Sequence, residues 1–280
     1  MTCAQALVAA QLLGLQRLDA QLLLLHALGK PASARSWLLA HDTDELTPEV
    51  AEAFRQSSLR RAAGEPVAYL VGSREFFGLD LQVDARVLVP RPDTETLVEW
   101  SLDLLRAPGL PPVLRVLDLG TGSGAIALAM AHSLQAAGHE AQVTAVDASG
   151  EALDVACENA RRLDLAVAFI ESNWFAQVNG RFHLIASNPP YIASADPHLA
   201  ALVHEPLRAL TAGADGLDDI RHIIAQAPDH LLSGGWLVLE HGYDQSERVR
   251  QLLAQRGFAQ VQSRLDLAGI ERCSGGQWQP

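Results

Sequence analysis

The segment Asn188–Pro189–Pro190–Tyr191 combines residue types that suit the recognition of a planar NH₂ group. Two consecutive prolines stiffen the backbone and carry no amide hydrogen, which leaves carbonyl oxygens as acceptors. With the side-chain oxygen of Asn188 they form a rigid acceptor pair, and Tyr191 supplies an aromatic wall. Such a nitrogen is a poor nucleophile, so holding it in line with an electrophile supplies several kcal/mol, about 7–11 at the upper limit. The alternative is a proline turn that only follows a buried strand.

The glycine-rich stretch Asp118–Gly124 joins a candidate strand to a candidate helix. Its glycines allow a sharp turn and the close approach of a ligand. The spacing Gly120-x-Gly122-x-x-Ala125 satisfies the dinucleotide fingerprint, which alone does not separate NAD from S-adenosylmethionine. Asp118 favours S-adenosylmethionine, because a carboxylate repels a pyrophosphate and attracts a cationic sulfonium or ammonium group. A glycine turn without a ligand is the alternative.

Asp147 stands at the end of the next candidate strand, where a carboxylate can accept both hydroxyls of a ribose. The alternative is an N-cap of the following helix, shared with Ser149. The ten histidines form no HExxH or comparable set, so we expect no metal site. His183, His204 and His241 are interpreted as structural.

These residues need a scaffold, and the chain after Pro112 alternates strands with helices, which predicts a parallel sheet covered on both faces. In such sheets ligands bind at the carboxyl ends of the strands. The candidate strands are Leu114–Leu119, Gln142–Val146, Val167–Glu171, His183–Ser187, Trp236–Glu240 and Ala259–Ser263. The candidate helices between them are Gly124–Ala136, Ser149–Leu163, Asp219–Leu232 and Gln245–Gln255.

The first third of the chain has leucines at three- and four-residue spacing, which predicts helices. One of these helices starts after Thr47, a good N-cap, and runs to about Ala63. A change to short β-like runs then indicates a linking hairpin, followed by a helix from Thr94 to Leu105. The β-like runs are Val67–Val71, Phe76–Phe77, Leu79–Val83 and Val87–Val89.

Composition limits the function classes. The 280 residues are 49% hydrophobic and 19% charged, which predicts a globular protein of one large or two unequal domains. A net charge of −12 argues against binding nucleic acid over the whole surface, although it does not exclude a local basic groove. Cys3, Cys157 and Cys273 show no CxxC spacing, so we expect no disulfide and a reduced, cytoplasmic setting. We expect neither a membrane span nor a signal peptide.

Asn188–Tyr191 together with the glycine loop resembles class I S-adenosylmethionine-dependent methyltransferases that act on planar nitrogens. These include adenine-N6 DNA methyltransferases and protein glutamine-N5 methyltransferases. Five further motifs resemble the peptide-chain release factor glutamine methyltransferases (PrmC/HemK), and this resemblance covers nearly the whole chain, including the helical N-terminal part. These motifs are Gly64–Gly72, Arg74–Phe76, Val89–Glu95, Glu205–Leu210 and Leu239–Gly242.

The resemblance implies a fold and a domain order. Residues 91–280 would form an α/β, Rossmann-like class I methyltransferase domain with a mostly parallel seven-stranded sheet and helices on both faces. Residues 65–90 would form a linking β-hairpin, and residues 1–64 a small N-terminal helical domain for substrate recognition.

The resemblance also implies the reaction. A methyl group would pass from S-adenosyl-L-methionine, leaving S-adenosyl-L-homocysteine, to the side-chain N5 of the glutamine in the Gly-Gly-Gln motif of class I peptide-chain release factors. The enzyme would act as a monomer, without stable nucleic-acid or membrane binding. A ribosomal-protein glutamine methyltransferase is the first alternative. An adenine-N6 DNA methyltransferase is less favoured, because the chain has neither a basic recognition domain nor net positive charge.

Two further alternatives belong to other classes. A module that binds S-adenosylmethionine without catalysis would not need the Asn-Pro-Pro sequence. An NAD oxidoreductase would leave the same sequence unexplained.

Positions that match the family's motifs carry its expected roles. The expected cofactor contacts are Gly120, Thr121, Gly122, Ser123, Gly124, Asp147, Trp174 and Asn188. The expected substrate clamp is Asn188, Pro189, Pro190 and Tyr191, of which Asn188, Pro189 and Tyr191 are the expected catalytic residues. Asn173 stands where the family has Asp before this Trp, so an acceptor for adenine is kept and its charge is lost. Arg91 and Glu95 are expected either to orient substrate or to form an ion pair at a helix start.

The C-terminal residues Ser274–Trp278 themselves contain a Gly-Gly-Gln triplet. Glu271–Gln277 is expected to form a last edge strand, which would make the triplet a coincidence. The alternative is that a mobile terminus enters the enzyme's own active site as a pseudo-substrate.

Overall fold

A computed structural model describes residues 1–279 of the chain, and these form two compact units, Met1–Ser73 and the residues from Arg74 onward. Each unit has a hydrophobic core of its own. Among the described residues, none of the helices combines the length and the apolar character that crossing a bilayer requires.

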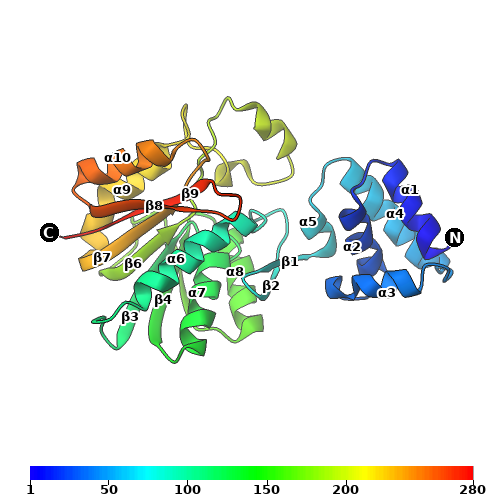
Figure 1. Ribbon diagram of the computed structural model, residues 1–280, viewed down its shortest axis with the longest axis horizontal. Helices are drawn as coiled ribbons and strands as arrows, with labels where there is room; N and C mark the ends of the chain where they lie inside the picture. Colours follow the sequence, from blue (N-terminus) through cyan, green and yellow to red (C-terminus); the bar gives the residue numbers. More distant parts are fainter. Residues whose placement is uncertain (280) are drawn as a thin grey trace. The chain divides into compact units, whose positions relative to one another are not determined.

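The first unit is helical, as its leucine spacing predicts. Thr47 caps its longest helix by accepting a hydrogen bond from the backbone N–H of Val50 at 3.4 Å. Leu23, Leu24 and Leu25 are fully buried in the core of the unit. Its helices are α1 (Cys3–Leu12), α2 (Arg17–Ala27), α3 (Arg35–Ala40), α4 (Pro48–Ala62) and α5 (Val67–Val71), with a 3₁₀ turn at Ala32–Ala34 (Figure 1).

Two of the predicted β-like runs are wrong. Val67–Val71 is the short helix α5, which follows Pro66, ends at Gly72 with φ 77° and buries Leu70 in the helical core. A five-residue apolar run carries too little periodicity to separate a strand from a buried helix, and tertiary packing decides. Val87–Val89 is not a strand either, because the Val87 N–H donates to Asp84 in a turn. The hairpin consists of β1 (Ser73–Phe76) and β2 (Leu79–Gln82).

The second unit is built on a seven-stranded sheet, which confirms the expected fold class. The strand order is β5-β4-β3-β6-β7-β9-β8, in which β9 runs antiparallel to both of its neighbours and the other pairs are parallel. The strands are β3 (Val113–Leu119), β4 (Glu140–Asp147), β5 (Val167–Glu171), β6 (Phe182–Ser187), β7 (Leu231–Glu240), β8 (Ala259–Leu265) and β9 (Glu271–Gln277).

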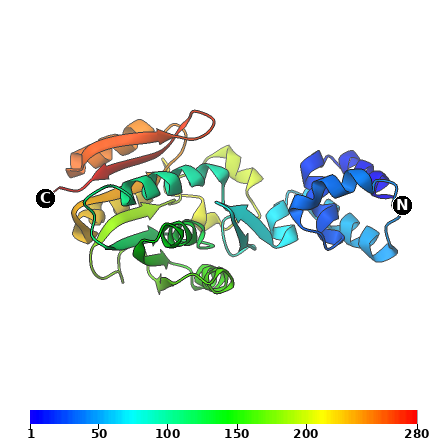
Figure 2. The ribbon, with the colours of Figure 1, turned by 60° about the horizontal axis from the view of Figure 1, so that its bottom comes forward.

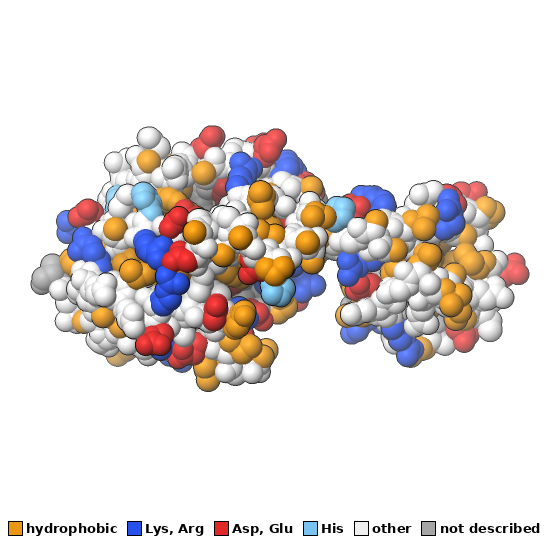
Figure 3. Space-filling model, turned by 90° about the horizontal axis from the view of Figure 1, so that it is seen from above, with side chains coloured by type: hydrophobic (Ala, Val, Ile, Leu, Met, Phe, Trp, Pro, Cys, Tyr) orange, Lys and Arg blue, Asp and Glu red, His pale blue; other side chains and the backbone are white. Residues whose placement is uncertain are grey.

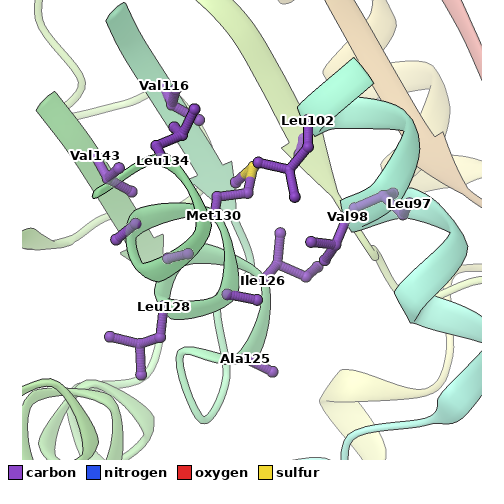
Figure 4. Packing of buried hydrophobic residues seen from close by; sticks show 14 of the residues in the cluster. Leu97, Val98, Leu102, Val116, Ala125, Ile126, Leu128, Met130, Leu134 and Val143 are labelled. Carbon is purple, nitrogen blue, oxygen red and sulfur yellow. The ribbon is translucent and has the colours of Figure 1, made fainter. Parts of the chain in front are cut away.

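Helices cover both faces of this sheet (Figure 1). One face carries α6 (Glu95–Leu105), α7 (Ala125–Ala136) and α8 (Gly150–Leu163), and the other carries α9 (Asp218–His230) and α10 (Ser246–Arg256). In Figure 4, Met130 of α7 lies beside Leu102 of α6, and Ile126 points toward Val98. These side chains are nearly or fully buried, so α7, which positions the glycine loop, is fixed firmly on the sheet.

The expectation that Glu271–Gln277 is an edge strand is also wrong, because β9 lies between β7 and β8 (Figure 2). A Cβ on Gly275 would lie 2.5 Å from the Leu237 carbonyl oxygen and 2.9 Å from the Trp100 ring. A Cβ on Gly276 would lie 2.8 Å from the Cβ of Phe258. Close packing therefore explains both glycines. The Gln277 amide donates to the Gly234 carbonyl at 2.9 Å, which holds this residue in the sheet.

Candidate active site

Four loops meet at one edge of the sheet because neighbouring parallel strands end in register. Leu119, the last residue of β3, pairs with Val146 of β4 and with Ser187 of β6. Asp147 pairs with Glu171, the last residue of β5. The glycine loop and the residues that follow β4, β5 and β6 therefore emerge side by side, where ligands bind in sheets of this kind.

The glycine loop turns sharply at the end of β3. Gly120, Gly122 and Gly124 have φ values of 71°, 54° and 85°, a region that other residues rarely adopt. The backbone N–H groups of Gly120 and Thr121 both donate to the Val146 carbonyl at 2.8 Å, which fastens the loop to β4. The loop is thereby held close to the sheet.

Asp118 lies fully buried behind this loop. Its Oδ2 accepts from the Thr121 hydroxyl at 2.6 Å and from the Ala127 N–H at 3.2 Å, whereas its Oδ1 has no hydrogen-bond partner. Burial raises the pKa of Asp118 to about 7, and the Asp147 charge acts in the same direction. Asp118 does not line the cavity between these loops, so the structure supports it as a residue that holds the glycine loop to α7 and not as a direct contact of a cationic ligand.

Asp147 holds two loops together. Its Oδ2 accepts from the Gly122 N–H and its Oδ1 from the Ser149 N–H, each at 2.9 Å. The N-cap of α8 is Ser149, whose Oγ accepts from the Ala152 N–H. Each Asp147 oxygen keeps a free lone pair, so the carboxylate can also accept from two ribose hydroxyls.

A cavity of about 240 Å³ opens between these loops. Of the predicted cofactor contacts, Gly120, Gly122, Asp147, Trp174 and Asn188 line it, and so do Asn173 and Pro190. Thr121, Ser123 and Gly124 do not line it. All three are buried; the Thr121 hydroxyl donates to Asp118, and the Ser123 carbonyl accepts from Asn159.

Trp174 forms one wall of this cavity in a constrained conformation. Its φ of 48° is unusual for a bulky residue. Its indole N–H donates to Asp219 Oδ1 at 3.1 Å, and its carbonyl accepts from the Ser172 hydroxyl at 3.0 Å. The ring lies over Gly120, where a Cβ would approach it to 3.5 Å. The indole is therefore only partly buried and faces the cavity, which differs from the ordinary environment of a core tryptophan.

A second, smaller cavity of about 90 Å³ adjoins the first. Asn188 and Tyr191 line it together with Arg91 and several apolar residues. Asn188, Leu88 and Ala209 line both cavities and so form the boundary between them. Pro189 is buried and lines neither cavity through its side chain.

Behind the second cavity, polar side chains form a buried cluster around Glu240, which is 1% exposed. The Asn188 Nδ2 lies 3.2 Å from the Thr94 hydroxyl, and the Tyr191 hydroxyl donates to Glu240 Oε1 at 3.3 Å. Burial raises the pKa of Glu240 to about 7, while hydrogen bonding from Thr94 and the positive charge of Arg272 lower it. Burial beside the Glu240 charge also raises the pKa of Tyr191, so Tyr191 stays a neutral donor.

Arg91 and Glu95 do not pair with each other. The Arg91 guanidinium binds Glu205 Oε1 at 2.5 Å, and Glu205 Oε2 accepts from the Val89 N–H at 3.2 Å. Glu95 accepts from the Phe77 N–H at 3.2 Å. The alternative that Arg91 and Glu95 form an ion pair at the helix start is therefore wrong. Arg91 instead pairs with the largely buried carboxylate of Glu205, 114 positions further along the chain.

Two of the histidines that were interpreted as structural have protein partners. His183 Nδ1 accepts from the Arg115 N–H at 2.9 Å, and buried His241 contacts the Ser274 hydroxyl through Nε2 at 2.7 Å. Within residues 1–279, no group of His, Cys, Asp and Glu side chains is arranged to hold a metal ion.

The sequence interpretation missed several residues of the larger cavity. Arg86, Arg208 and Asp219 line it, and Arg208 also contacts the Ser149 hydroxyl. Arg86 lies in a turn, Arg208 in a 3₁₀ turn and Asp219 in the first turn of α9. Only the two acids Asp218–Asp219 before an apolar face carry a local signal, which predicts a helix start and not a site.

The sheet order and the loops at its carboxyl edge define a class I, Rossmann-like methyltransferase. The sequence comparisons give the family. Residues 2–72 match the PrmC N-terminal domain and residues 104–263 match the methyltransferase small domain. The release factor glutamine methyltransferase of Bordetella pertussis is 50% identical over 267 residues, which are 94% of this chain and 95% of that protein. The chain belongs to the release factor glutamine methyltransferases.

A further sequence comparison agrees with this family, and a structural comparison agrees with the fold. The release factor glutamine methyltransferase of Pseudomonas aeruginosa is 50% identical over 268 residues, which are 94% of this chain and 92% of that protein. A solved methyltransferase from Pyrococcus furiosus superposes with a TM-score of 0.52 at 20% identity, covering 73% of this chain and 91% of that one. At that identity the structural likeness supports the fold alone.

Proposed function

We propose that this enzyme transfers the methyl group of S-adenosylmethionine to the side-chain nitrogen of the glutamine in the Gly-Gly-Gln motif of a class I release factor. The observation that carries the proposal is the pair of adjoining cavities with Asn188 at their boundary. A methyl transfer between two bound molecules needs this arrangement, because donor and acceptor must meet in line at one point.

The larger cavity is proposed to hold the cofactor. Asp147 would accept the ribose hydroxyls, Trp174 would lie against the adenine with Asn173 as an acceptor, and Gly120 and Gly122 would allow close approach of the methionyl part. Thr121, Ser123 and Gly124 would act indirectly, by holding the loop. S-adenosylmethionine would supply an electrophilic methyl group on a sulfonium centre.

The smaller cavity is proposed to hold the glutamine side chain. The Asn188 side-chain oxygen and the Pro189 carbonyl would accept its two N–H bonds, while Tyr191 and Pro190 would confine the amide plane. Holding the nitrogen in this way directs its lone pair toward the first cavity and raises its electron density. The methylated nitrogen is strongly acidic and loses its proton to water, so no strong base is required.

A ribosomal-protein glutamine methyltransferase would share this core. The match of residues 2–72 to the PrmC N-terminal domain favours a release factor as the protein substrate. On the face drawn in Figure 3, basic side chains are interspersed with acidic ones and form no continuous stripe. This distribution, with a net charge of −12, disfavours DNA as the substrate.

We further propose that the enzyme acts as a monomer in the cytoplasm. The three cysteines are free in the structure, which is compatible with a reducing compartment.

The direct test is mass spectrometry of purified release factor after incubation with enzyme and S-adenosylmethionine. We expect a gain of one methyl group on the glutamine of the Gly-Gly-Gln motif, and none when that glutamine is replaced by Ala. A ribosomal protein preparation incubated in parallel serves as the competing substrate. Methylation of that preparation alone, or of another residue of the release factor, would contradict the proposal.

A further inference from the structure

The Asn188–Tyr191 clamp has to be held at its two ends. Its two prolines carry no amide hydrogen, so neither can be tied to the fold through a backbone N–H. The residue before the clamp, Ser187, belongs to β6, and its hydroxyl donates to the Leu119 carbonyl at 2.7 Å. The position of the clamp relative to the cofactor cavity therefore depends on what holds its other end, the carbonyl of Tyr191.

A buried glutamine, Gln245, holds this carbonyl. Its Nε2 donates to the Tyr191 carbonyl at 3.0 Å and lies 3.4 Å from the Asp215 carbonyl. Its Oε1 accepts from the Gly242 N–H at 2.8 Å, and the residue is 7% exposed. A reversed amide would place its NH₂ against an N–H and its oxygen against two carbonyls, so these backbone groups admit one orientation only. Because an amide does not titrate, the bonds depend on no protonation state.

These contacts of Gln245 serve the surrounding loops and not its own helix. Gln245 occupies the N-cap position of α10, where Ser, Thr, Asp and Asn are preferred because their short side chains reach the first backbone N–H groups. The Gln245 side chain makes no such capping bond. A glutamine at this position is therefore explained by the segments that it joins, which are the clamp, the loop before α9 and the backbone just after β7.

The loop before α9 also packs against the Tyr191 carbonyl. A Cβ on Gly216 would overlap the Tyr191 carbonyl oxygen and lie 2.8 Å from Gln245 Nε2. Ile192, which follows the clamp, donates its N–H to the Leu210 carbonyl of the same loop at 2.9 Å. The clamp and this loop are therefore packed together, and Gln245 ties both of them to the backbone that follows β7.

We propose that Gln245 is a positioning residue for the methyl transfer, which holds the Tyr191 carbonyl and thereby keeps the clamp in line with the cofactor. The inference rests on the proposed function, because it names what fixes the clamp of that same site. Gln245 lines neither cavity, so it acts through the clamp. Transfer between two bound groups is sensitive to such support, since a displacement of about 1 Å can lower the rate about 100-fold.

The first test compares Gln245→Met with Gln251→Met in the full-length enzyme, using release factor as substrate. Methionine is close to glutamine in size and forms none of the bonds described above. Gln251 is exposed on α10, where its amide donates to Glu247 at 3.2 Å, and it serves as the control position. We expect Gln245→Met to lower kcat about tenfold or more, with a KM for S-adenosylmethionine within about twofold of wild type. Gln251→Met should keep the wild-type kcat.

A purely structural role of Gln245 would give a different result. It would lower the fraction of folded enzyme and leave kcat per folded molecule unchanged. Urea denaturation at the assay temperature gives that fraction, by which kcat is corrected. A corrected kcat of Gln245→Met within about threefold of wild type would overturn the proposal. An equal loss in Gln251→Met, or a parallel loss of cofactor affinity in Gln245→Met, would do the same.

The second test displaces the same carbonyl from the side of the loop, by comparing Gly216→Ala with Gly213→Ala. The two glycines have φ values of 73° and 71°, so the backbone strain of an alanine is common to both variants. A Cβ on Gly213 would overlap the carboxylate of Asp218, whose side chain is 64% exposed and can move aside. We expect Gly216→Ala to lower kcat about tenfold more than Gly213→Ala does. Equal kcat values in the two variants would contradict the proposal.

A double variant that combines Gln245→Met with Gly216→Ala connects the two tests. Both substitutions act on the Tyr191 carbonyl, so the combined loss in kcat should be smaller than the product of the single losses. A combined loss equal to that product would show that Gln245 acts elsewhere and would overturn the proposal. If Gln245→Met does not fold, the glycine pair decides alone. Failure of wild-type enzyme to methylate the release factor would instead contradict the proposed function, so the two failures are distinguishable.

Discussion

Asn188 combines two tasks at the boundary of the cavities, and its removal should separate chemistry from binding. We expect Asn188→Ala to lower kcat by about 100-fold or more, because loss of positioning at the reacting nitrogen acts on the transition state. Cofactor affinity should fall only modestly, since the other residues of the larger cavity remain. Steady-state kinetics and calorimetry with S-adenosylmethionine measure the two effects. Turnover within a few-fold of wild type would show that the clamp is misassigned.

Asp147→Ala is expected to show the opposite pattern. A ribose contact away from the reacting methyl group acts almost equally in ground and transition states, so KM for the cofactor should rise more than kcat falls. Asp147 also ties Gly122 to Ser149, and circular dichroism must show that the fold is intact. A cofactor KM equal to that of wild type would remove Asp147 from the site.

Asp118 should make stability depend on pH in a direction opposite to that of a salt-bridged acid. Its pKa is about 7 in the folded protein against an ordinary value of 3.8, so the folded state binds the proton more tightly than the unfolded state. The resulting stabilisation is complete below about pH 4 and is lost as the pH rises through 7.

Asp118→Asn keeps an acceptor for Thr121 and carries no charge, so its free energy of unfolding does not decrease with rising pH through this group. The free energy of unfolding of wild type relative to Asp118→Asn should therefore fall between about pH 4 and pH 8, by at most about 4 kcal/mol. Urea denaturation of both proteins across this pH range measures the difference between their free energies of unfolding. The contributions of the other titrating groups are common to both proteins and cancel in this difference. Parallel pH curves for the two proteins would contradict the assignment.

Among the elements, α7 depends on the glycine at its start. A Cβ on Gly124 would lie 2.9 Å from Leu128 Cδ1 and 3.3 Å from the Cβ of Ala156, whereas a Cβ on Gly138 beyond the end of α7 meets nothing within 4 Å. Both glycines have positive φ, 85° and 76°. Gly138→Ala is therefore a matched control for backbone strain alone.

We expect Gly124→Ala to lower the free energy of unfolding by about 1–3 kcal/mol more than Gly138→Ala, the usual cost of overpacking a core. It should also weaken cofactor binding, because Gly124 ends the loop that lines the larger cavity. Thermal unfolding and calorimetry test both effects. Equal destabilisation by the two substitutions would mean that Leu128 and Ala156 move aside without cost.

Local sequence signals predicted the strands and loops that position the site. They did not predict the side-chain contacts between site residues and residues far away in the sequence. The glycine loop and Asn188–Tyr191 directly follow strands and Asp147 ends one, and the carboxyl ends of parallel strands must meet at one edge. The pairing of Arg91 with Glu205 and that of Trp174 with Asp219 join segments far apart in sequence. No spacing rule indicates such pairs, because packing of the whole domain creates them.

The molecule as a whole consists of two units with separate cores, and they should be separable. All residues that line the two cavities belong to the unit that begins at Arg74. We expect a fragment of residues 73–280, which keeps β1 whole, to fold and to bind S-adenosylmethionine with a Kd within about threefold of the full chain.

The same fragment should methylate intact release factor at least about tenfold less efficiently, because a second contact surface raises the effective concentration of substrate at the site. A short Gly-Gly-Gln peptide, which is too small to use that surface, is the control substrate and should react equally with both forms. Full activity of the fragment on intact release factor would contradict a recognition role for residues 1–73.

The position of β9 inside the sheet has a consequence for biosynthesis. This strand follows β8 in the chain, yet it is the partner through which β8 joins the sheet, and its Gly275 packs against Trp100 of α6. Domains otherwise begin to fold from the N-terminal side while the chain is still being made. During synthesis β8 therefore leaves the ribosome before the strand that joins it to the sheet, so this side of the sheet is completed only once β9 has emerged.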